Sequence, residues 1–325
     1  MLRFTIRRLL ISIPLLLVAS VLVFTVIHLT IDPTAAVASN PRLSVQDIQH
    51  YRHDLGLDRS GPAQYFAWLG NFVRGRWGTS LFTSIRVSTQ IREALANSLF
   101  LGLTGFAIAL LIGVSVGVIA AVRQYSVFDY LATSGAFVFL SVPVFWFALI
   151  VQLLFGLYMV RWLHLQEPIF FTAGLSRPGS VGFDLVDRLR HVALPAVVLA
   201  VQSIAVYSRY MRASMLEVLG SDYLRTARAK GVRERRVITN HGMRNALIPL
   251  TTQAAIDFGA LAGGLIVTEQ IFQWPGMGRL FIQAMNDGDY AIALPWVMLT
   301  MTFVITFNLV ADLLYAVLDP RIRYA

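Results

Sequence analysis

The stretch Ser221-Asp-Tyr-Leu-Arg-Thr-Ala-Arg-Ala-Lys-Gly231 is the polar segment around which the rest of the chain is organised. Long apolar segments lie on both sides of it, and nine of the chain's 27 basic residues fall between positions 209 and 244. Only Glu217, Asp222 and Glu234 oppose these charges within the same interval. Because so polar a stretch cannot enter lipid, it must lie in water between two membrane-spanning segments.

The stretch has the start and stop signals of a short helix. Ser221 or Asp222 can cap its N-terminus, where unpaired N–H groups need an acceptor. Arg228 and Lys230 stand in the last turn, which favours cations, and Gly231 can turn the chain left-handed without a Cβ clash. A helix is therefore predicted over residues 222–230, ended by a glycine hinge.

The apolar residues of this helix favour a docking element over a plain loop. Tyr223, Leu224 and Ala227 share one face by their spacing, and a second helix is predicted to start near Arg233. The simpler alternative is a cytoplasmic loop whose basic charge only fixes orientation in the membrane. Two helices with apolar faces and a glycine between them indicate instead a surface that meets a partner.

The composition is that of a polytopic membrane protein. Hydrophobic residues make up 56% of the 325 residues, charged residues only 14%, and the mean hydropathy is +0.64. A water-soluble domain cannot bury that much apolar surface. The net charge of +9 is explained by loops that face the anionic cytoplasmic leaflet, so no nucleic-acid partner is expected.

Several kinds of chemistry are excluded by the residues that the chain lacks. It has no cysteine, and Lys230 is its only lysine. A phosphate-binding loop for ATP hydrolysis needs Gly-Lys-Ser/Thr, whereas Lys230 lies between Ala229 and Gly231. We expect no catalytic residue, bound cofactor or metal site in this chain.

The chain is predicted to be an all-α membrane protein with six spans and both termini in the cytoplasm. The spans are long runs with few charges, residues 9–31, 94–122, 130–160, 191–208, 246–271 and 290–311, and a span needs about 20 residues. The organisation is a first span (1–31), an extracytoplasmic helical lid (32–93), a five-span core (94–320) that includes residues 221–231, and a cytoplasmic tail (321–325). Within the lid, helices are predicted near 44–56 and over 63–73.

Two carboxylates in the fifth predicted span are candidates for a translocation path or gate. Asp257 falls at mid-membrane, where a charge is costly, so it either lines a path or is held by hydrogen bonds between helices. Glu269 lies nearer the outer end, where a structural role is an alternative. The two are twelve residues apart, about 18 Å along a helix, which is too far for an acid/base pair.

Three aromatic and proline features complete the set of candidates. Pro143 interrupts the third predicted span and frees backbone groups that neighbouring helices must satisfy. Trp146 belongs to an aromatic cluster that can line a path or pack against lipid. Trp274, Pro275 and Gly276 form a sharp outer turn.

Four stretches carry a resemblance to a known family. They are the basic start with the first span; 55–59 with 64–68 and 78–81; 222–231 followed by 244–249; and 263–279 with the closing 312–315 and 318–321. These residues resemble the permease subunits of bacterial dipeptide/oligopeptide ABC importers, a family that includes nickel permeases. The resemblance covers essentially the whole chain and implies the type I importer fold in the bacterial inner membrane.

The resemblance implies that the polar stretch is a coupling helix. The residues of this chain that would contact a separate ATPase are Tyr223, Leu224, Arg225, Ala227, Arg228, Lys230 and Gly231. The implied partners are two ATPase domains that bind ATP and Mg, a second and non-identical permease, and an extracytoplasmic peptide-binding protein. Two departures stand out: Arg225-Thr-Ala227 replaces the family's Glu-Ala-Ala, and Arg76-Trp77 replaces a common Asp-Leu in the lid.

The function expected from these observations is passage of peptides from a binding protein into the cytoplasm. One alternative is a nickel or other small-solute ABC permease. Others are a proton-coupled carrier that uses Asp257, or a structural membrane scaffold. Neither of the last two needs a docking helix.

Overall fold

The structure, a computed structural model, describes residues 2–30, 46, 53, 58–80, 82–177, 179, 182, 184–261 and 265–318. Within these ranges the chain is helical, and the only β pairing is an isolated bridge between Thr79 and Arg86. The predicted all-α fold is therefore confirmed. Apart from residues 46 and 53, the predicted helix near 44–56 lies outside the described residues, as does the tail at 321–325.

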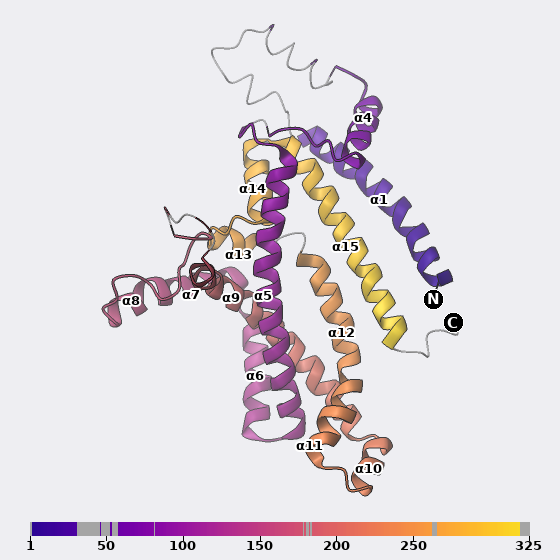
Figure 1. Cartoon of the computed structure of the whole chain (residues 1–325), viewed down its shortest axis with the longest axis vertical. Coiled ribbons are helices and arrows are strands. Elements are labelled where there is room, and N and C mark those ends of the chain that lie inside the picture. The colour runs from indigo at the N-terminus through magenta and orange to yellow at the C-terminus, as the bar shows by residue number, and fades with distance from the viewer. Residues whose placement is uncertain are drawn as a thin grey trace.

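Long helices run side by side along the molecule, and short helices lie toward its two ends and at one side between them (Figure 1). In chain order they are α1 (Leu2–Thr30), α4 (Gly61–Val73), α5 (Val87–Val122), α6 (Val127–Ser141), α7 (Val144–Leu153), the π-helical turn η1 (Leu154–Tyr158), α8 (Met159–Trp162), α9 (Leu185–Leu219), α10 (Asp222–Ala229), α11 (Glu234–Arg236), the π-helical turn η2 (Val237–Gly242), α12 (Met243–Ala260), α13 (Ile266–Ile271), α14 (Met277–Asp287) and α15 (Tyr290–Leu318). Helices α10 and α11 mark the lower end in Figure 1, and α4 and α14 the upper end.

Helices α5 and α9 form the central pair, and glycines on α5 let the two backbones approach closely. A Cβ atom placed on Gly117 would lie 2.6 Å from the carbonyl oxygen of Ser208, and one on Gly113 would lie 2.9 Å from Cβ of Tyr207. Small residues at such crossings allow close van der Waals packing in lipid. Gly113 and Gly117 are therefore close-approach positions between α5 and α9.

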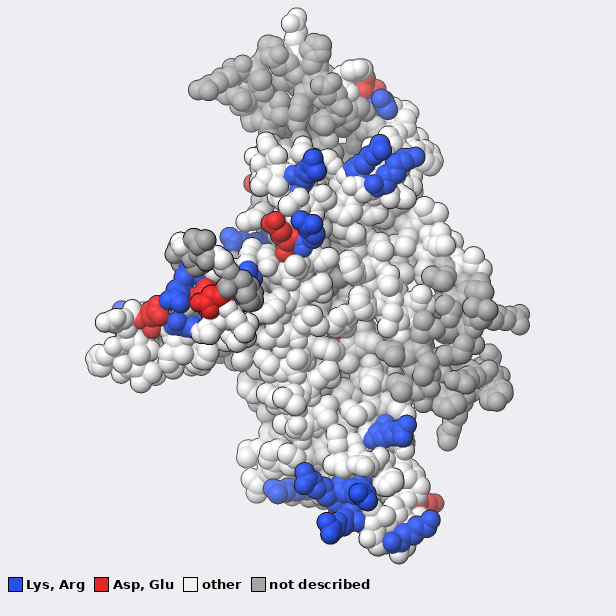
Figure 2. Space-filling view, viewed as in Figure 1, with Lys and Arg blue, Asp and Glu red and all other residues white. Residues whose placement is uncertain are grey.

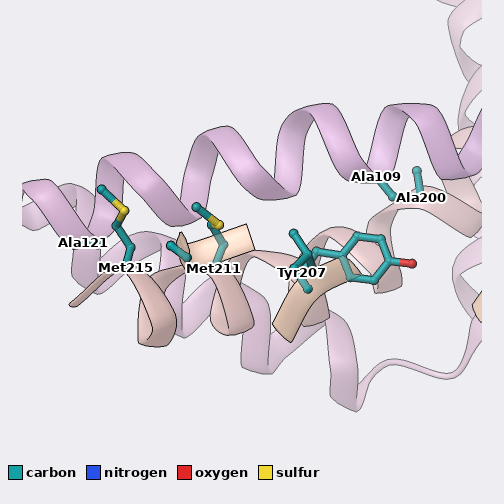
Figure 3. Packing of buried hydrophobic residues seen from close by; sticks show 8 residues of the cluster. Ala109, Ala121, Ala200, Tyr207, Met211 and Met215 are labelled. Atoms are coloured by element: carbon teal, nitrogen blue, oxygen red, sulfur yellow. The ribbon is translucent and has the colours of Figure 1, made fainter. Parts of the chain in front are cut away.

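The same pair buries the largest part of the core. Tyr207, Met211 and Met215 project from one face of α9 at a spacing of four residues and are fully buried near Ala109 and Ala121 of α5 (Figure 3). Where such contacts lie within lipid, they stabilise by dispersion and shape fit, because lipid tails are as apolar as the core.

The third predicted span is two helices rather than one. Helix α6 ends at Ser141, Pro143 is the N-cap of α7, and α7 leaves α6 at a large angle (Figure 1). Proline removes a donor and clashes with the preceding turn, which breaks the helix at this point. The carbonyl of Val142, freed by the break, accepts a hydrogen bond of 3.2 Å from Gln202 Nε2 of α9.

The fifth predicted span is also divided, into α12 and α13. Five helices within the described part of the chain are long and apolar enough to cross a membrane: 10–30, 87–122, 144–162, 185–219 and 290–310. Helix α12 is not among these five, and its 18 residues include Arg244, Gln253 and Asp257. Its polar groups therefore need hydrogen-bond partners on α12 itself or on neighbouring helices.

The described part of the lid packs on the first span. Helix α4 begins with Pro62 in its first turn and is followed by Gly75 at φ +70°, as its sequence predicts. The hydroxyls of Tyr65 and Ser20 lie 2.7 Å apart, and Phe24 meets Tyr65 edge to face. Helix α4 is therefore fixed against α1.

Candidate functional site

The docking element, defined here as residues 221–242, lies at the end of the molecule where α9 stops and α12 begins (Figure 1). It consists of α10, a turn at Gly231, α11 and η2. Lysine and arginine side chains gather at this end of the molecule in the space-filling view (Figure 2). The predicted helix, hinge and second helix are all present.

Two fully buried side chains anchor the docking element. Leu224 of α10 and Val237 at the start of η2 are both 0% exposed, and α10 packs on η2. The Asn245 side-chain amide donates a hydrogen bond of 2.8 Å to the Tyr223 hydroxyl, which ties α10 to the first turn of α12. Since η2 continues directly into α12, these contacts join α10 to α12.

The turn after α10 is set by Gly231. Its φ of +74° is one that residues with a Cβ rarely adopt, and its N–H donates to the Arg228 carbonyl at 2.9 Å. Across the turn, the Arg228 guanidinium donates to both carboxylate oxygens of Glu234, with the shortest distance 2.9 Å. This hydrogen bond holds the pKa of Glu234 below its ordinary value.

The predicted side-chain cap of α10 is wrong. Ser221 occupies the N-cap position, but neither it nor Asp222 caps the helix with its side chain. The Ser221 hydroxyl instead donates at 2.5 Å to the Val218 carbonyl at the end of α9, which also accepts from the Ser221 backbone N–H at 3.0 Å. The hydroxyl therefore satisfies the preceding helix end rather than the following one.

The outer face of α10 is basic and open. The Arg225 side chain is 72% exposed, Lys230 is exposed, and Ala227 is half-buried between the two faces. A short helix that is apolar inside and basic outside can seat on an acidic or polar groove of a partner while its inner face moves α12.

Asp257 belongs to α12, and its side chain faces α9. It accepts hydrogen bonds of 2.8 Å from the Tyr207 hydroxyl and from Gln253 Nε2, and its side chain is half-buried. The arrangement matches the inter-helix hydrogen bond that the sequence left open as one alternative. A role for Asp257 in a path or gate stays a prediction.

Glu269 is fully buried, in a cluster that joins α5, α13 and α14. Its carboxylate accepts hydrogen bonds from the Ser98 hydroxyl at 2.6 Å and from the backbone N–H groups of Leu265 at 3.2 Å and Arg279 at 3.1 Å. Ser98 Oγ in turn accepts from the N–H of Met277 at 2.7 Å. This geometry favours the structural role for Glu269, and the gate role is a prediction.

The outer turn closes over the same cluster. Trp274 is 0% exposed, and its indole N–H donates to the Asn97 carbonyl at 3.0 Å. The Asn97 side chain donates back to the Pro275 carbonyl at 2.9 Å. Gly276 lies so close to Glu269 and Ser98 that a Cβ atom there would overlap both side chains.

Pro143 and Trp146 lie at the break between α6 and α7. Both are exposed, Trp146 to 52%. Their outward position leaves either lipid or a second subunit to cover them.

Sequence reasoning missed the partners that complete these clusters. Ser98 is 171 residues from Glu269 in the chain, and no spacing signals that pair. Asp129 and Arg212 form a further missed pair, at 2.5 and 2.8 Å, with Asp129 only 1% exposed. Their positions at the ends of neighbouring apolar runs were the one available signal. Among the described residues, no group of three His, Asp or Glu side chains could hold a metal.

Comparison with known proteins gives matches along the whole chain. Residues 113–324 match the family described as binding-protein-dependent transport system inner membrane component, and residues 1–84 match its N-terminal family. The chain is 39% identical over 322 residues to the oligopeptide transport system permease protein AppB of Bacillus subtilis, covering 99% of both chains. It is 36% identical over 340 residues to the dipeptide transport system permease protein DppB of Escherichia coli K12, covering 100% of this chain and 99% of DppB.

A solved structure shares the fold. The inward-facing MetNI methionine ABC transporter matches with a TM-score of 0.52 and 16% identity, over 70% of this chain and 96% of the solved chain. At that identity the likeness concerns the arrangement of helices alone.

Proposed function

Because the chain belongs to the family of binding-protein-dependent transport system inner membrane components, we propose that it is the membrane permease subunit of an ATP-driven importer of short peptides. The observation that carries the proposal is the docking element. Its anchored apolar face and exposed basic face suit a joint with a separate energy-supplying subunit. The chain itself lacks the Gly-Lys-Ser/Thr sequence that ATP hydrolysis by a phosphate-binding loop needs.

The proposed mechanism starts at α10. Two partner ATPase domains, which bind ATP and Mg, close on nucleotide and carry the docked helix with them. Leu224 and the Tyr223–Asn245 hydrogen bond pass this movement to η2 and α12. Helix α12 then shifts against α9, where the Tyr207–Asp257 hydrogen bond is the polar contact that must move or break.

The remaining partners follow from the same proposal. A second, non-identical permease would complete the path, and an extracytoplasmic binding protein would deliver the peptide to the lid side. The docking element and both termini would then face the cytoplasm. The names of the relatives favour peptide over nickel as the substrate class.

The test is co-purification followed by transport. The chain is expressed with its genomic neighbours, purified in detergent and reconstituted for peptide-stimulated ATP hydrolysis and uptake. We expect an ATPase to co-purify and uptake to require ATP. If the chain purifies alone and a proton gradient drives solute uptake by it, the proposal is wrong and Asp257 becomes the centre of a carrier mechanism.

A matched pair of glycine variants locates the joint. Gly231→Arg and Gly75→Arg both place a large cation at a position with φ near +70° and no atom within 4 Å of the new Cβ. Backbone strain is therefore the same in both. We expect only Gly231→Arg to release the ATPase, and equal loss in both variants would contradict docking at α10.

A further inference from the structure

A second site lies between α6 and α9 and includes no residue of the docking element. It is a cavity of about 560 Å³ lined by Thr133, Val206, Arg209, Tyr210, Arg212 and Ala213. Tyr210 is 45% exposed, so the cavity opens to the surface rather than into the core. No step of the proposed transport mechanism uses it.

The cavity holds one uncompensated positive charge. Arg212 is neutralised by the buried carboxylate of Asp129 through two hydrogen bonds. The Arg209 guanidinium lies 4.5 Å from the ring centroid of Phe137, and among the described residues no carboxylate lies within ion-pair distance of it. The hydroxyls of Tyr210 and Thr133 stand in the same lining, so hydrogen-bond donors accompany the charge.

The position of Arg209 along α9 places the cavity at the membrane surface, on the side of the docking element. Arg209 is the first charged residue after the uncharged run 191–208, and α9 continues for ten more residues to Leu219. At 35 residues, α9 is about 52 Å long, well beyond the roughly 30 Å of a hydrocarbon core. Arginine and tyrosine at the end of an apolar run lie at headgroup level.

An apolar surface adjoins the charge. Leu131, Phe137 and Val138 of α6 are 68%, 52% and 60% exposed. A free anion would use only the guanidinium and hydroxyls, whereas a lipid also covers these side chains with its acyl chains. Basic pockets between helices on the cytoplasmic side suit anionic headgroups.

We propose that this cavity binds the phosphate headgroup of an anionic phospholipid. Arg209 makes charge-assisted hydrogen bonds to the phosphate, which it can engage through two donors at once. Tyr210 donates from the same wall, and the acyl chains lie along α6. The ion pair between Asp129 and Arg212 holds the two walls of the cavity together.

The test measures lipid retention by the purified full-length chain. Phosphatidylglycerol and phosphatidylcholine with identical acyl chains are titrated, and binding is followed by native mass spectrometry and thermal shift. We expect phosphatidylglycerol to bind at least ten-fold more tightly than phosphatidylcholine. Arg209→Gln should abolish that preference, while Arg209→Lys, which keeps the charge, should retain part of it.

Arg123→Gln is the matched control, because Arg123 is exposed near the same membrane surface and does not line the cavity. It should keep the full preference. The proposal is overturned if Arg209→Gln binds phosphatidylglycerol as the wild type does, or if Arg123→Gln loses the preference equally. Equal thermal protection by inorganic phosphate would also overturn it, because the site would then take a free anion.

Discussion

Replacing Glu269 by Gln separates a structural role from a gating role for this buried carboxylate. The change keeps the shape of the side chain and removes its charge. With the amide oxygen facing Ser98 and Leu265, the new NH₂ group faces the N–H of Arg279, which now lies 3.1 Å from a donor. One charge-assisted hydrogen bond is lost and a buried N–H is left without an acceptor.

These losses set the expected magnitude. A hydrogen bond to a charged group contributes roughly 1.5–3 kcal/mol, and an unsatisfied buried donor costs roughly 1–3 kcal/mol, in part the same energy. The expected fall in the free energy of unfolding is therefore about 2–4 kcal/mol. In a large domain, each kcal/mol of lost stability lowers Tm by a few degrees, so Tm should fall by roughly 5–10 °C.

The assay is thermal unfolding of the purified chain in detergent, followed by tryptophan fluorescence, since Trp274 is buried in the same cluster. Glu93→Gln is the control, because Glu93 is exposed on α5, the helix that carries Ser98. It should leave Tm unchanged. A Glu269→Gln variant that unfolds with the wild type but has lost transport would refute the structural account and support a gate.

Three further outcomes are expected. Asp129→Asn should lower the free energy of unfolding by roughly 3 kcal/mol, because it leaves Arg212 without its buried partner; an unchanged denaturant midpoint would contradict this. Gly117→Ala should lower stability by roughly 1–3 kcal/mol through overlap with α9. The control Gly135→Ala, with no atom within 4 Å, should not destabilise in the same Tm assay. Because the Arg228 hydrogen bond lowers the pKa of Glu234, the ionised carboxylate stabilises the docking element at pH values above its ordinary pKa of 4.5. This stabilisation is lost as the pH falls through the lowered pKa. The protection of the α10 amides, measured relative to their intrinsic exchange rate at each pH, should therefore fall in acid for the wild type, and Glu234→Gln should lack that acid dependence.

Local signals in the sequence predicted much of this fold. Runs of apolar residues mark helices such as α5 and α15. The helix at 222–229 and the left-handed turn at Gly231 follow from propensity and glycine chemistry. Each of these features depends on residues within one or two helical turns.

The remainder depends on contacts between distant parts of the chain. The side chain of Ser221 had two helix ends within reach, and only packing decides that it bonds to the end of α9. Pro143 predicted an interruption of the third span, but no local pattern identifies Gln202 of α9 as the donor to the freed Val142 carbonyl. The burial of Glu269 required Ser98, a partner that no local pattern identifies.

A cross-link from α10 to an ATPase tests the central claim most directly. The chain has no cysteine, so Arg225→Cys gives a single reactive thiol on the exposed face of α10, and Arg161→Cys gives one on α8 as the control. With the co-expressed ATPase carrying its own single cysteines, we expect disulfide or short-spacer cross-links from position 225 and none from 161. Efficient cross-linking from 161, or none from 225 in a complex that still hydrolyses ATP, would contradict α10 as the joint.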